Sequence, residues 1–301
     1  YVRANVSGEQ SAIENWPPGR ITDPVLSPDG TRVALTINNE AEGRDIWDYH
    51  LERHTLSRVT YSGDSHEPLW SPDGQTLVFE DGRSGLGMWQ INANGAGIVE
   101  KLMTTNSSRT MPKEFSPDGS KLIYMELEGS WDLNMLDFND AENSQQPLIN
   151  SEFTEWDANI SPDGRWIAYK SDETGRFEVY VRSFPAVNSG KIQVSINGGR
   201  EPQWSHDGNS LYYIDDAEST LVAVPVDLES GFTYGTAVTM ASVAFANNDP
   251  PNYVLLPDDQ SFLIQKPVEG LTNPNTPRAV SAVLVDNWFE ELNRLAPPDQ
   301  Q

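Results

Sequence analysis

The sequence predicts an all-β protein, a six-bladed β-propeller built from four-stranded antiparallel blades. Three observations lead to this fold class. A Pro-Asp-Gly turn recurs along the 301 residues, apolar residues alternate with polar ones after each turn, and aromatic residues make up 10% of the chain. Alternation with a period of two is typical of a strand that has one face in a core.

Six copies of the turn divide the chain, and successive copies start 44, 45, 45, 44 and 51 residues apart. The copies begin at Pro28, Pro72, Pro117, Pro162, His206 and Pro257. This interval is that of one four-stranded propeller blade, so six copies predict six blades. Proline presets φ, aspartate bonds nearby amides, and glycine adopts the positive φ that reverses the chain.

Each repeat shows four strands in the same order. The first strand ends with an apolar residue two positions before the turn, namely Leu26, Trp70, Phe115, Ile160, Trp204 and Leu255. The second strand follows the turn, and its alternating apolar residues begin at Val33, Leu77, Leu122, Ile167, Leu211 and Phe262. The remaining residues supply two outer strands, as in "FEVYVRSF" followed by "KIQVSI". A single sheet buries too little surface, so six are expected to stack radially.

The two ends of the chain are expected to meet in the last blade. Segments "SFLIQKP" and "AVSAVLV" are predicted strands, and the N-terminal "YVRAN" or "EQSAI" is predicted to add the missing outer strand. Residues 1–301 would then form a single domain. Apolar residues at helical spacing in "NWFEELNRL" predict a short C-terminal helix against the side of the wheel.

The chain is strongly acidic, with 45 Asp and Glu against 20 Lys and Arg, a net charge of −25. Such a surface repels phosphate and anionic lipid, which argues against nucleic-acid binding and direct membrane insertion. No apolar run reaches the roughly 18 residues of a membrane span. The absence of cysteine excludes disulfides and thiolate metal sites. The start at Tyr1, without Met, suggests a mature form or an excised domain, and a monomer is expected.

The "SPDG" turns followed by alternating apolar residues resemble the TolB-type six-bladed propeller with WD-like repeats. That resemblance implies a periplasmic or extracellular protein. "SDETGRFEVYVRSFP" and "NWFEELNRL" are similar to propeller segments of bacterial serine/threonine kinases and membrane-tethered regulators. The chain has no Gly-rich loop, His-Arg-Asp or Asp-Phe-Gly motif, so this resemblance implies the sensor portion alone.

Carboxylates recur five residues before the turns, where the innermost strand begins. The six positions hold Asp23, Glu67, Pro112, Asp157, Glu201 and Asn252. Four acids at equivalent places should converge on one mouth of the central channel, where they repel one another unless a cation or water separates them. They either cap backbone amides between blades, or bind Ca²⁺, another divalent cation or a cationic ligand.

Residues beside these acids would give the mouth its chemical identity. They are His66, Arg109, Lys113, Trp156, Arg200 and Tyr253. Mixed charges and aromatic rings in one funnel suit a polar small molecule, a sugar or a peptide. The alternative is that they are ordinary solvated loop residues.

The leading hypothesis is a non-catalytic propeller that senses a ligand or binds a protein through the channel mouth and one rim. The sequence has no G-x-S-x-G or H-E-x-x-H motif to support catalysis. An alternative is a propeller hydrolase or lyase that uses a channel-bound divalent metal, with His66 or a carboxylate as base. A third is a scaffold whose channel holds only water.

Overall fold

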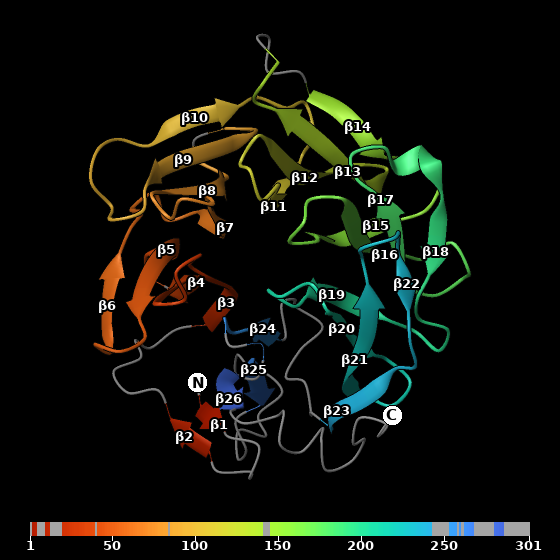
Figure 1. Cartoon of the computed structure of the whole chain (residues 1–301). Helices are drawn as coiled ribbons and strands as arrows, with labels where there is room; N and C mark the ends of the chain where they lie inside the picture. Colours follow the sequence, from red (N-terminus) through yellow and green to blue (C-terminus); the bar gives the residue numbers. More distant parts are fainter. Residues whose placement is uncertain are drawn as a thin grey trace.

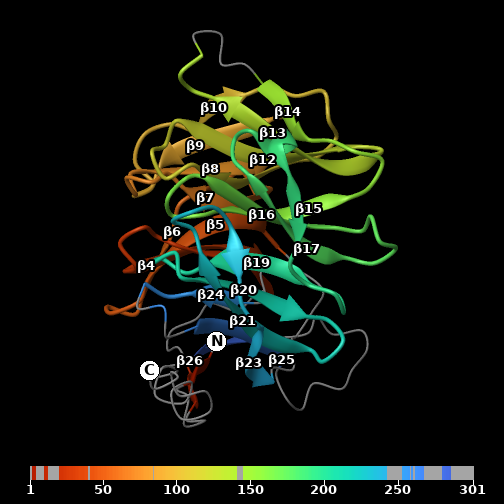
Figure 2. The same cartoon turned by 45° about the vertical axis from the view of Figure 1, so that its right-hand side comes forward.

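A computed structural model describes residues 2–4, 10–12, 20–39, 41–83, 85–140, 145–242, 253–257, 259, 262–267 and 280–285. These residues form a wheel of antiparallel β-sheets arranged around a central axis (Figure 1). The sheets follow one another around the wheel in sequence order, and each turns its first strand toward the axis (Figure 2). The all-β propeller architecture predicted from the sequence is therefore confirmed.

Five sheets are complete blades, numbered here in chain order. Blade 1 comprises β3 (Arg20–Leu26), β4 (Arg32–Asn39), β5 (Gly43–His50) and β6 (Thr55–Arg58). Blade 2 comprises β7 (Ser65–Trp70), β8 (Thr76–Asp81), β9 (Met88–Asn92) and β10 (Glu100–Met103). Blade 3 comprises β11 (Thr110–Phe115), β12 (Lys121–Glu128), β13 (Ser130–Asp137) and β14 (Gln145–Ile149). Blade 4 comprises β15 (Glu155–Ile160), β16 (Trp166–Ser171), β17 (Glu178–Ser183) and β18 (Lys191–Gln193). Blade 5 comprises β19 (Arg200–Trp204), β20 (Ser210–Asp215), β21 (Thr220–Asp227), β22 (Thr233–Tyr234) and β23 (Val238–Ser242). A 3₁₀ turn, η1 (Val187–Ser189), joins β17 to β18.

The repeated turn has the geometry that its sequence predicts. In the first copy, Gly30 has φ +69° and its amide donates to the carbonyl of Ser27 at 2.8 Å. The Asp29 carboxylate accepts bonds from the Ser27 hydroxyl at 2.6 Å and the Thr31 amide at 3.0 Å. The same serine and aspartate contacts recur in the next four copies. Each turn is thus a locally determined unit.

The predicted count of six four-stranded blades is wrong. The described residues form five complete blades, and the sixth repeat forms a three-stranded sheet of β24 (Tyr253–Leu255), β25 (Phe262–Pro267) and β26 (Val280–Val285). This sheet lies between blade 5 and blade 1. Val254 joins the apolar cluster of blade 1, and the ring of Phe262 packs on that of Tyr212 in blade 5, with ring centres 5.4 Å apart. The longer interval before the sixth turn accompanies the departure from the repeat.

Two departures from the turn sequence compensate each other. Asp259 replaces the glycine of the sixth turn and keeps a positive φ of 51°. Its carboxylate accepts bonds from the amides of His206, at 2.8 Å, and Asp207, at 3.0 Å. A proline at 206 would have no N–H to donate. Histidine in the fifth turn therefore makes it possible for aspartate in the sixth turn to link the two sheets.

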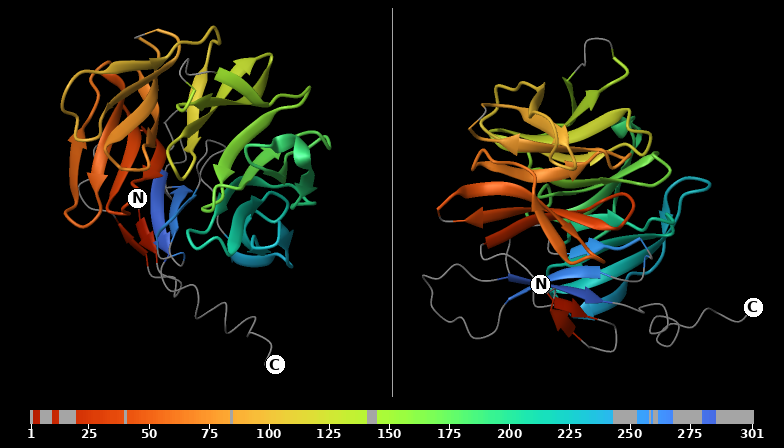
Figure 3. Two further views of the ribbon diagram at one scale, coloured as in Figure 1. Left: turned by 45° about the horizontal axis from the view of Figure 1, so that its top comes forward. Right: turned by 90° about the vertical axis from the view of Figure 1, so that its left-hand side faces the viewer.

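The chain ends are only partly described. β1 (Val2–Ala4) and β2 (Gln10–Ala12) pair with each other and lie next to β26, where Figure 3 shows the red hairpin beside the blue strands. That the N-terminal segment completes the last blade within one domain stays a prediction. The predicted C-terminal helix, around Trp288 to Leu295, lies outside the described residues.

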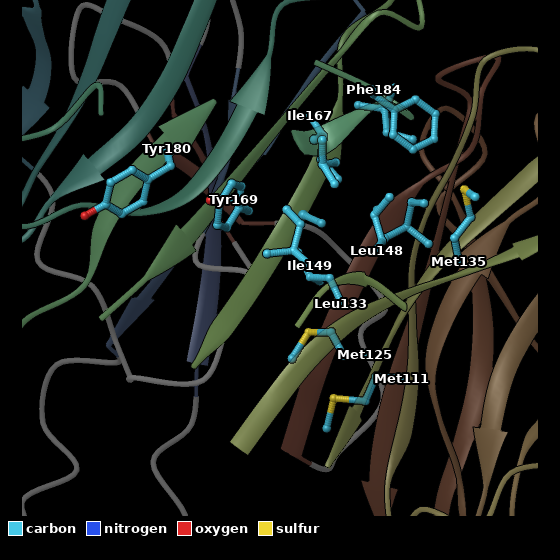
Figure 4. Close-up of a cluster of buried hydrophobic side chains, with 14 residues drawn as sticks. Met111, Met125, Leu133, Met135, Leu148, Ile149, Ile167, Tyr169, Tyr180 and Phe184 are labelled. Atoms are coloured by element: carbon cyan, nitrogen blue, oxygen red, sulfur yellow. The ribbon is translucent and has the colours of Figure 1, made fainter. Parts of the chain in front are cut away.

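Apolar side chains between neighbouring blades form the core. The cluster between blades 3 and 4 includes Met125 and Leu133 from one sheet and Ile167 and Tyr169 from the other, each at most 1% exposed (Figure 4). Burial of such side chains contributes about 1.5 to 3 kcal/mol each. Blades are therefore held together mainly by their faces, which leaves the inner strand edges to form a channel.

Candidate site at the channel mouth

A cavity of about 560 Å³ runs along the axis of the wheel. Its wall is made by the innermost strands β3, β7, β11, β15, β19 and β24, together with the residues that follow them. Residues from six sheets far apart in sequence thus face one space, which is large enough for a small ligand or a few peptide residues.

All four predicted ring carboxylates line this cavity: Asp23, Glu67, Asp157 and Glu201. Each sits at a shift in the strand register and has a positive φ between 54° and 56°. This conformation is uncommon for residues other than glycine, asparagine and aspartate. A bulge re-aims the side chain of a strand residue, and here it turns the carboxylate toward the axis.

Two of the carboxylates also connect neighbouring blades. Asp23 accepts a bond from the amide of Glu67 at 3.4 Å, and Asp157 accepts one from the amide of Glu201 at 3.3 Å. Glu67 has no such partner in blade 3, because the equivalent residue is Pro112. Instead, the Glu67 carboxylate accepts a bond from the Lys113 ammonium at 3.1 Å. The capping interpretation thus holds for two acids of the ring.

Basic side chains of the protein neutralise much of the ring. Besides Lys113 on Glu67, Lys170 pairs with Asp157 at 2.8 Å and Arg200 with Glu201 at 2.7 Å. Burial alone would lower the pKa of Lys113, but the carboxylates of Glu67, Asp157 and Asp23 outweigh it and raise the pKa. Burial raises the pKa of Glu67, and Lys113 offsets part of this effect.

Among the described residues Asp23 makes no ion pair. It accepts bonds from the Thr22 hydroxyl at 2.9 Å and from the Glu67 amide. Asp23 therefore differs from the other three ring acids, each of which pairs with a described basic side chain.

A second layer of polar side chains, which the sequence reasoning missed, lies deeper in the channel wall. Three residues before the turn, blades 3, 4 and 5 carry Glu114, Asn159 and Gln203, whereas Val25 and Leu69 occupy this position in blades 1 and 2. Asn159 donates to Glu114 at 2.6 Å. Burial raises the pKa of Glu114 to about 8, against the opposing effect of the Asn159 bond. Polar residues at the same position of three successive repeats were the sequence signal that could have revealed this layer.

His66 and Arg109 meet through a residue that the sequence reasoning also missed. Glu80 lies 3.1 Å from the His66 Nε2 atom and 3.1 Å from the Arg109 Nε atom. Burial alone would lower the pKa of His66, but Glu80 outweighs it and raises the pKa. His66 is 4% exposed and does not line the cavity, so this group links blade 2 to blade 3 beside the mouth.

The other predicted mouth residues lie off the cavity wall. Trp156 packs edge-on against Trp131 at 4.7 Å, and Tyr253 is 1% exposed and donates to the Glu201 carbonyl at 2.7 Å. Arg200 bridges Glu201 and Asp216, at 2.7 Å and 2.6 Å. Of the six, only Lys113 faces the cavity. A ligand-binding role for any of them stays a prediction.

Basic side chains lie among the ring acids. Within the part of the chain that the structure describes, no three His, Asp or Glu side chains are grouped to hold a metal. The charge that a divalent cation would supply comes from Lys113, Lys170 and Arg200. Binding of Ca²⁺ at the ring stays a prediction.

Comparison with known proteins identifies the family. The model of the TolB β-propeller domain matches residues 1–155. The Tol-Pal system protein TolB of Francisella tularensis subsp. tularensis (strain WY96-3418) is 26% identical over 212 residues, which are 68% of this chain and 48% of that protein. An uncharacterised peptidase of Bacillus subtilis (strain 168), YuxL, is 28% identical over 64% of this chain and 29% of its own length. The chain thus spans about half, or less, of these relatives.

Solved structures share the fold. A putative TolB of Agrobacterium tumefaciens aligns with a TM-score of 0.61 at 18% identity, over 79% of this chain and 88% of its own. An oligogalacturonate lyase in complex with manganese aligns with a TM-score of 0.59 at 13% identity, over 96% and 97%. None of the described helical segments is long and apolar enough to cross a membrane. Because the family model matches half of the chain, the chain belongs to the TolB β-propeller domain family.

Proposed function

We propose that this propeller is a non-catalytic module that binds a segment of a partner polypeptide at the mouth of its channel. One observation carries the proposal: the axial cavity of about 560 Å³, whose wall presents four ring carboxylates and a single ammonium, that of Lys113. Peptides bring backbone donors and basic side chains, and although three of the ring acids already pair with basic side chains, the four carboxylates outnumber the one ammonium on this wall.

The proposed partner is a protein of an extracytoplasmic compartment, the periplasm or the cell exterior. Support comes from the family and from relatives named as components of the Tol-Pal system. The chain covers about half of those relatives, so their partners do not transfer without a test. A role as the sensor portion of a kinase or membrane-tethered regulator is a narrower version of the same proposal.

The alternative function, a hydrolase or lyase with a channel-bound metal, has weaker support. A relative named as an uncharacterised peptidase matches part of this chain and a lyase shares its fold, but neither likeness transfers chemistry by itself. Three of the four ring acids are already paired with basic side chains. Turnover of oligosaccharide or peptide substrates that depends on an added divalent cation would favour this alternative over binding.

The test is selection of peptides that bind the wild-type protein, followed by affinity measurements on charge variants. The double variant Asp23→Asn and Asp157→Asn removes two ring charges but keeps the acceptor oxygens, and asparagine tolerates the positive φ of both positions. Glu229→Gln, on an exposed rim of blade 5, is the matched control. We expect the double variant to bind selected peptides about tenfold more weakly and the control to bind unchanged. Equal affinity for all three proteins would refute the proposed site.

A further inference from the structure

Blades 2 and 3 form a second cavity, of about 380 Å³, which shares Pro72 and Phe115 with the wall of the channel cavity. Its apolar lining comes from Val78, Leu102, Phe115 and Phe138, and Phe115 stacks on Phe138 with ring centres 6.2 Å apart. Its polar lining includes Asp73, Thr76, Gln90, Asp118 and Gly119. An aromatic floor with carboxylates beside it is the wall that a flat cation prefers.

The neighbouring interface shows what fills the equivalent space. Between blades 1 and 2, Arg32 lies over the ring of Trp70, with the guanidinium carbon 4.5 Å from the ring centre. The same guanidinium donates to the carbonyl of Gly74 at 3.3 Å and pairs with Asp48 at 3.3 Å. The protein therefore fills this position with an arginine of its own.

The residues at the equivalent repeat positions of blades 2 and 3 differ from those of blades 1 and 2. Thr76 stands where blade 1 has Arg32, each two residues after the turn glycine, and Phe115 stands where blade 2 has Trp70. Strand register places Gln90 opposite Val78, as Asp48 is opposite Ala34. Arginine to threonine and tryptophan to phenylalanine are both losses of volume, and together they account for the cavity.

Part of what holds a guanidinium remains at this interface, although Gln90 replaces the Asp48 carboxylate that pairs with Arg32. Gly119, on the cavity wall, corresponds to Gly74, whose carbonyl accepts the bond from Arg32. Asp73 and Asp118 also face the cavity, and serine hydroxyls and backbone amides lower their pKa values, that of Asp118 to about 2. Both carboxylates are thus charged at neutral pH.

We propose that this cavity, named the blade 2–3 pocket, binds an arginine side chain of a partner polypeptide. The guanidinium would stack on Phe115, donate to the carbonyl of Gly119 and lie beside Asp73 and Asp118. Arginine suits this wall better than lysine, because its planar group stacks on a ring and donates in several directions at once.

The experiment uses three blocked tripeptides, acetyl-Gly-Arg-Gly-amide and its lysine and citrulline counterparts, titrated into methyl-labelled protein. Val78 and Leu102 methyl signals report the blade 2–3 pocket, and those of Leu26 and Val254, which belong to a different apolar cluster, report the channel. We expect the arginine peptide to shift the pocket signals with a dissociation constant on the order of 1 mM, about fivefold tighter than the lysine peptide. The uncharged citrulline peptide should give no saturable shift.

Variants decide the assignment. Thr76→Arg restores the arginine that blade 1 has and should abolish the shifts, whereas Ser210→Arg, at the same repeat position in blade 5, should leave them unchanged. Phe115→Leu, a residue that other repeats use at this position, should weaken binding while preserving the fold, so the test does not depend on one variant.

Pocket signals that do not move, or that still move in Thr76→Arg, would overturn the proposal. Equal shifts with citrulline would show packing without recognition of charge and would overturn it as well. Shifts confined to Leu26 and Val254 would place the peptide in the channel, which contradicts this inference but leaves the proposed function standing.

Discussion

Replacing Lys113 with methionine should destabilise the fold, and most strongly at neutral pH. The ammonium lies 3.1 Å from Glu67, with the lysine side chain 15% exposed and the glutamate side chain 22% exposed. Breaking a fully buried pair costs about 3 to 5 kcal/mol, and partial exposure reduces this to about 2 to 3 kcal/mol. Methionine keeps the length of the aliphatic stem, so the loss reports charge and not packing.

The cost should shrink as the pH falls. Burial raises the pKa of Glu67 in the folded protein, and loss of Lys113 raises it further. A carboxyl group whose pKa is raised by folding is protonated more readily in the folded protein as the pH falls, so at pH 5 the unpaired charge of Glu67 costs less than at pH 7. Urea unfolding followed by tryptophan fluorescence at pH 5 and pH 7 measures the difference.

The double variant Lys113→Met and Glu67→Gln is the control, and it should recover most of the stability at pH 7 because residue 67 no longer carries a buried charge without its partner. A single variant within 0.5 kcal/mol of wild type, by the usual scale of surface pairs, would refute the reasoning. So would a cost that is equal at both pH values.

Three further predictions concern stability and are checked by chemical denaturation. His206→Pro and Asp259→Gly should each cost about 1 to 2 kcal/mol, and together less than their sum, since both remove the bond from the His206 amide to the Asp259 carboxylate; strict additivity would contradict the link between the turns. Burial raises the pKa of Glu114 to about 8 from an ordinary 4.5, so the free energy of unfolding should fall by at most about 5 kcal/mol as the pH rises from 4.5 to 8, because only the folded protein still holds the proton. The variant Glu114→Gln should not show this pH dependence. A variant with the same pH profile as the wild type would contradict the buried position of the Glu114 carboxyl group. Trp204→Phe should cost about 1 kcal/mol, since its indole donates to the Asn159 carbonyl at 3.0 Å, and no loss would show that packing alone suffices.

The sequence predicts what the repeat encodes locally. Turn geometry at Asp29 and Gly30 depends on residues within five positions, so one copy explains the others. The position of Asp23 and its three equivalents on the channel wall follows from their common place at the start of the innermost strand. The repeat therefore predicted the propeller and the ring of acids.

The pairing of side chains could not be predicted in the same way. The partners of Glu67 and Glu80 are Lys113 and Arg109, 46 and 29 residues away and in the next blade. The bulge at each ring position also shifts the strand register, which turns Trp156 toward Trp131 instead of the channel. Simple alternation along the strand does not reveal such a shift.

The sixth repeat shows the limit of counting motifs. Its turn keeps Pro257 and replaces glycine with Asp259, whose carboxylate accepts bonds from the previous turn while its amide keeps the bond of its own turn, to the Leu256 carbonyl at 3.0 Å. The described part of this repeat is a three-stranded sheet that closes the wheel between blade 5 and blade 1. A turn sequence marks a sector of the wheel but does not guarantee four strands in it.

Photo-cross-linking with a selected peptide that carries a benzophenone group tests the proposed function most directly, because mass spectrometry of the adducts locates the bound peptide. The channel account predicts adducts on residues of the axial cavity, such as Pro24, Pro68 and Lys113. Adducts confined to the outermost strands, β6 or β18, would contradict it.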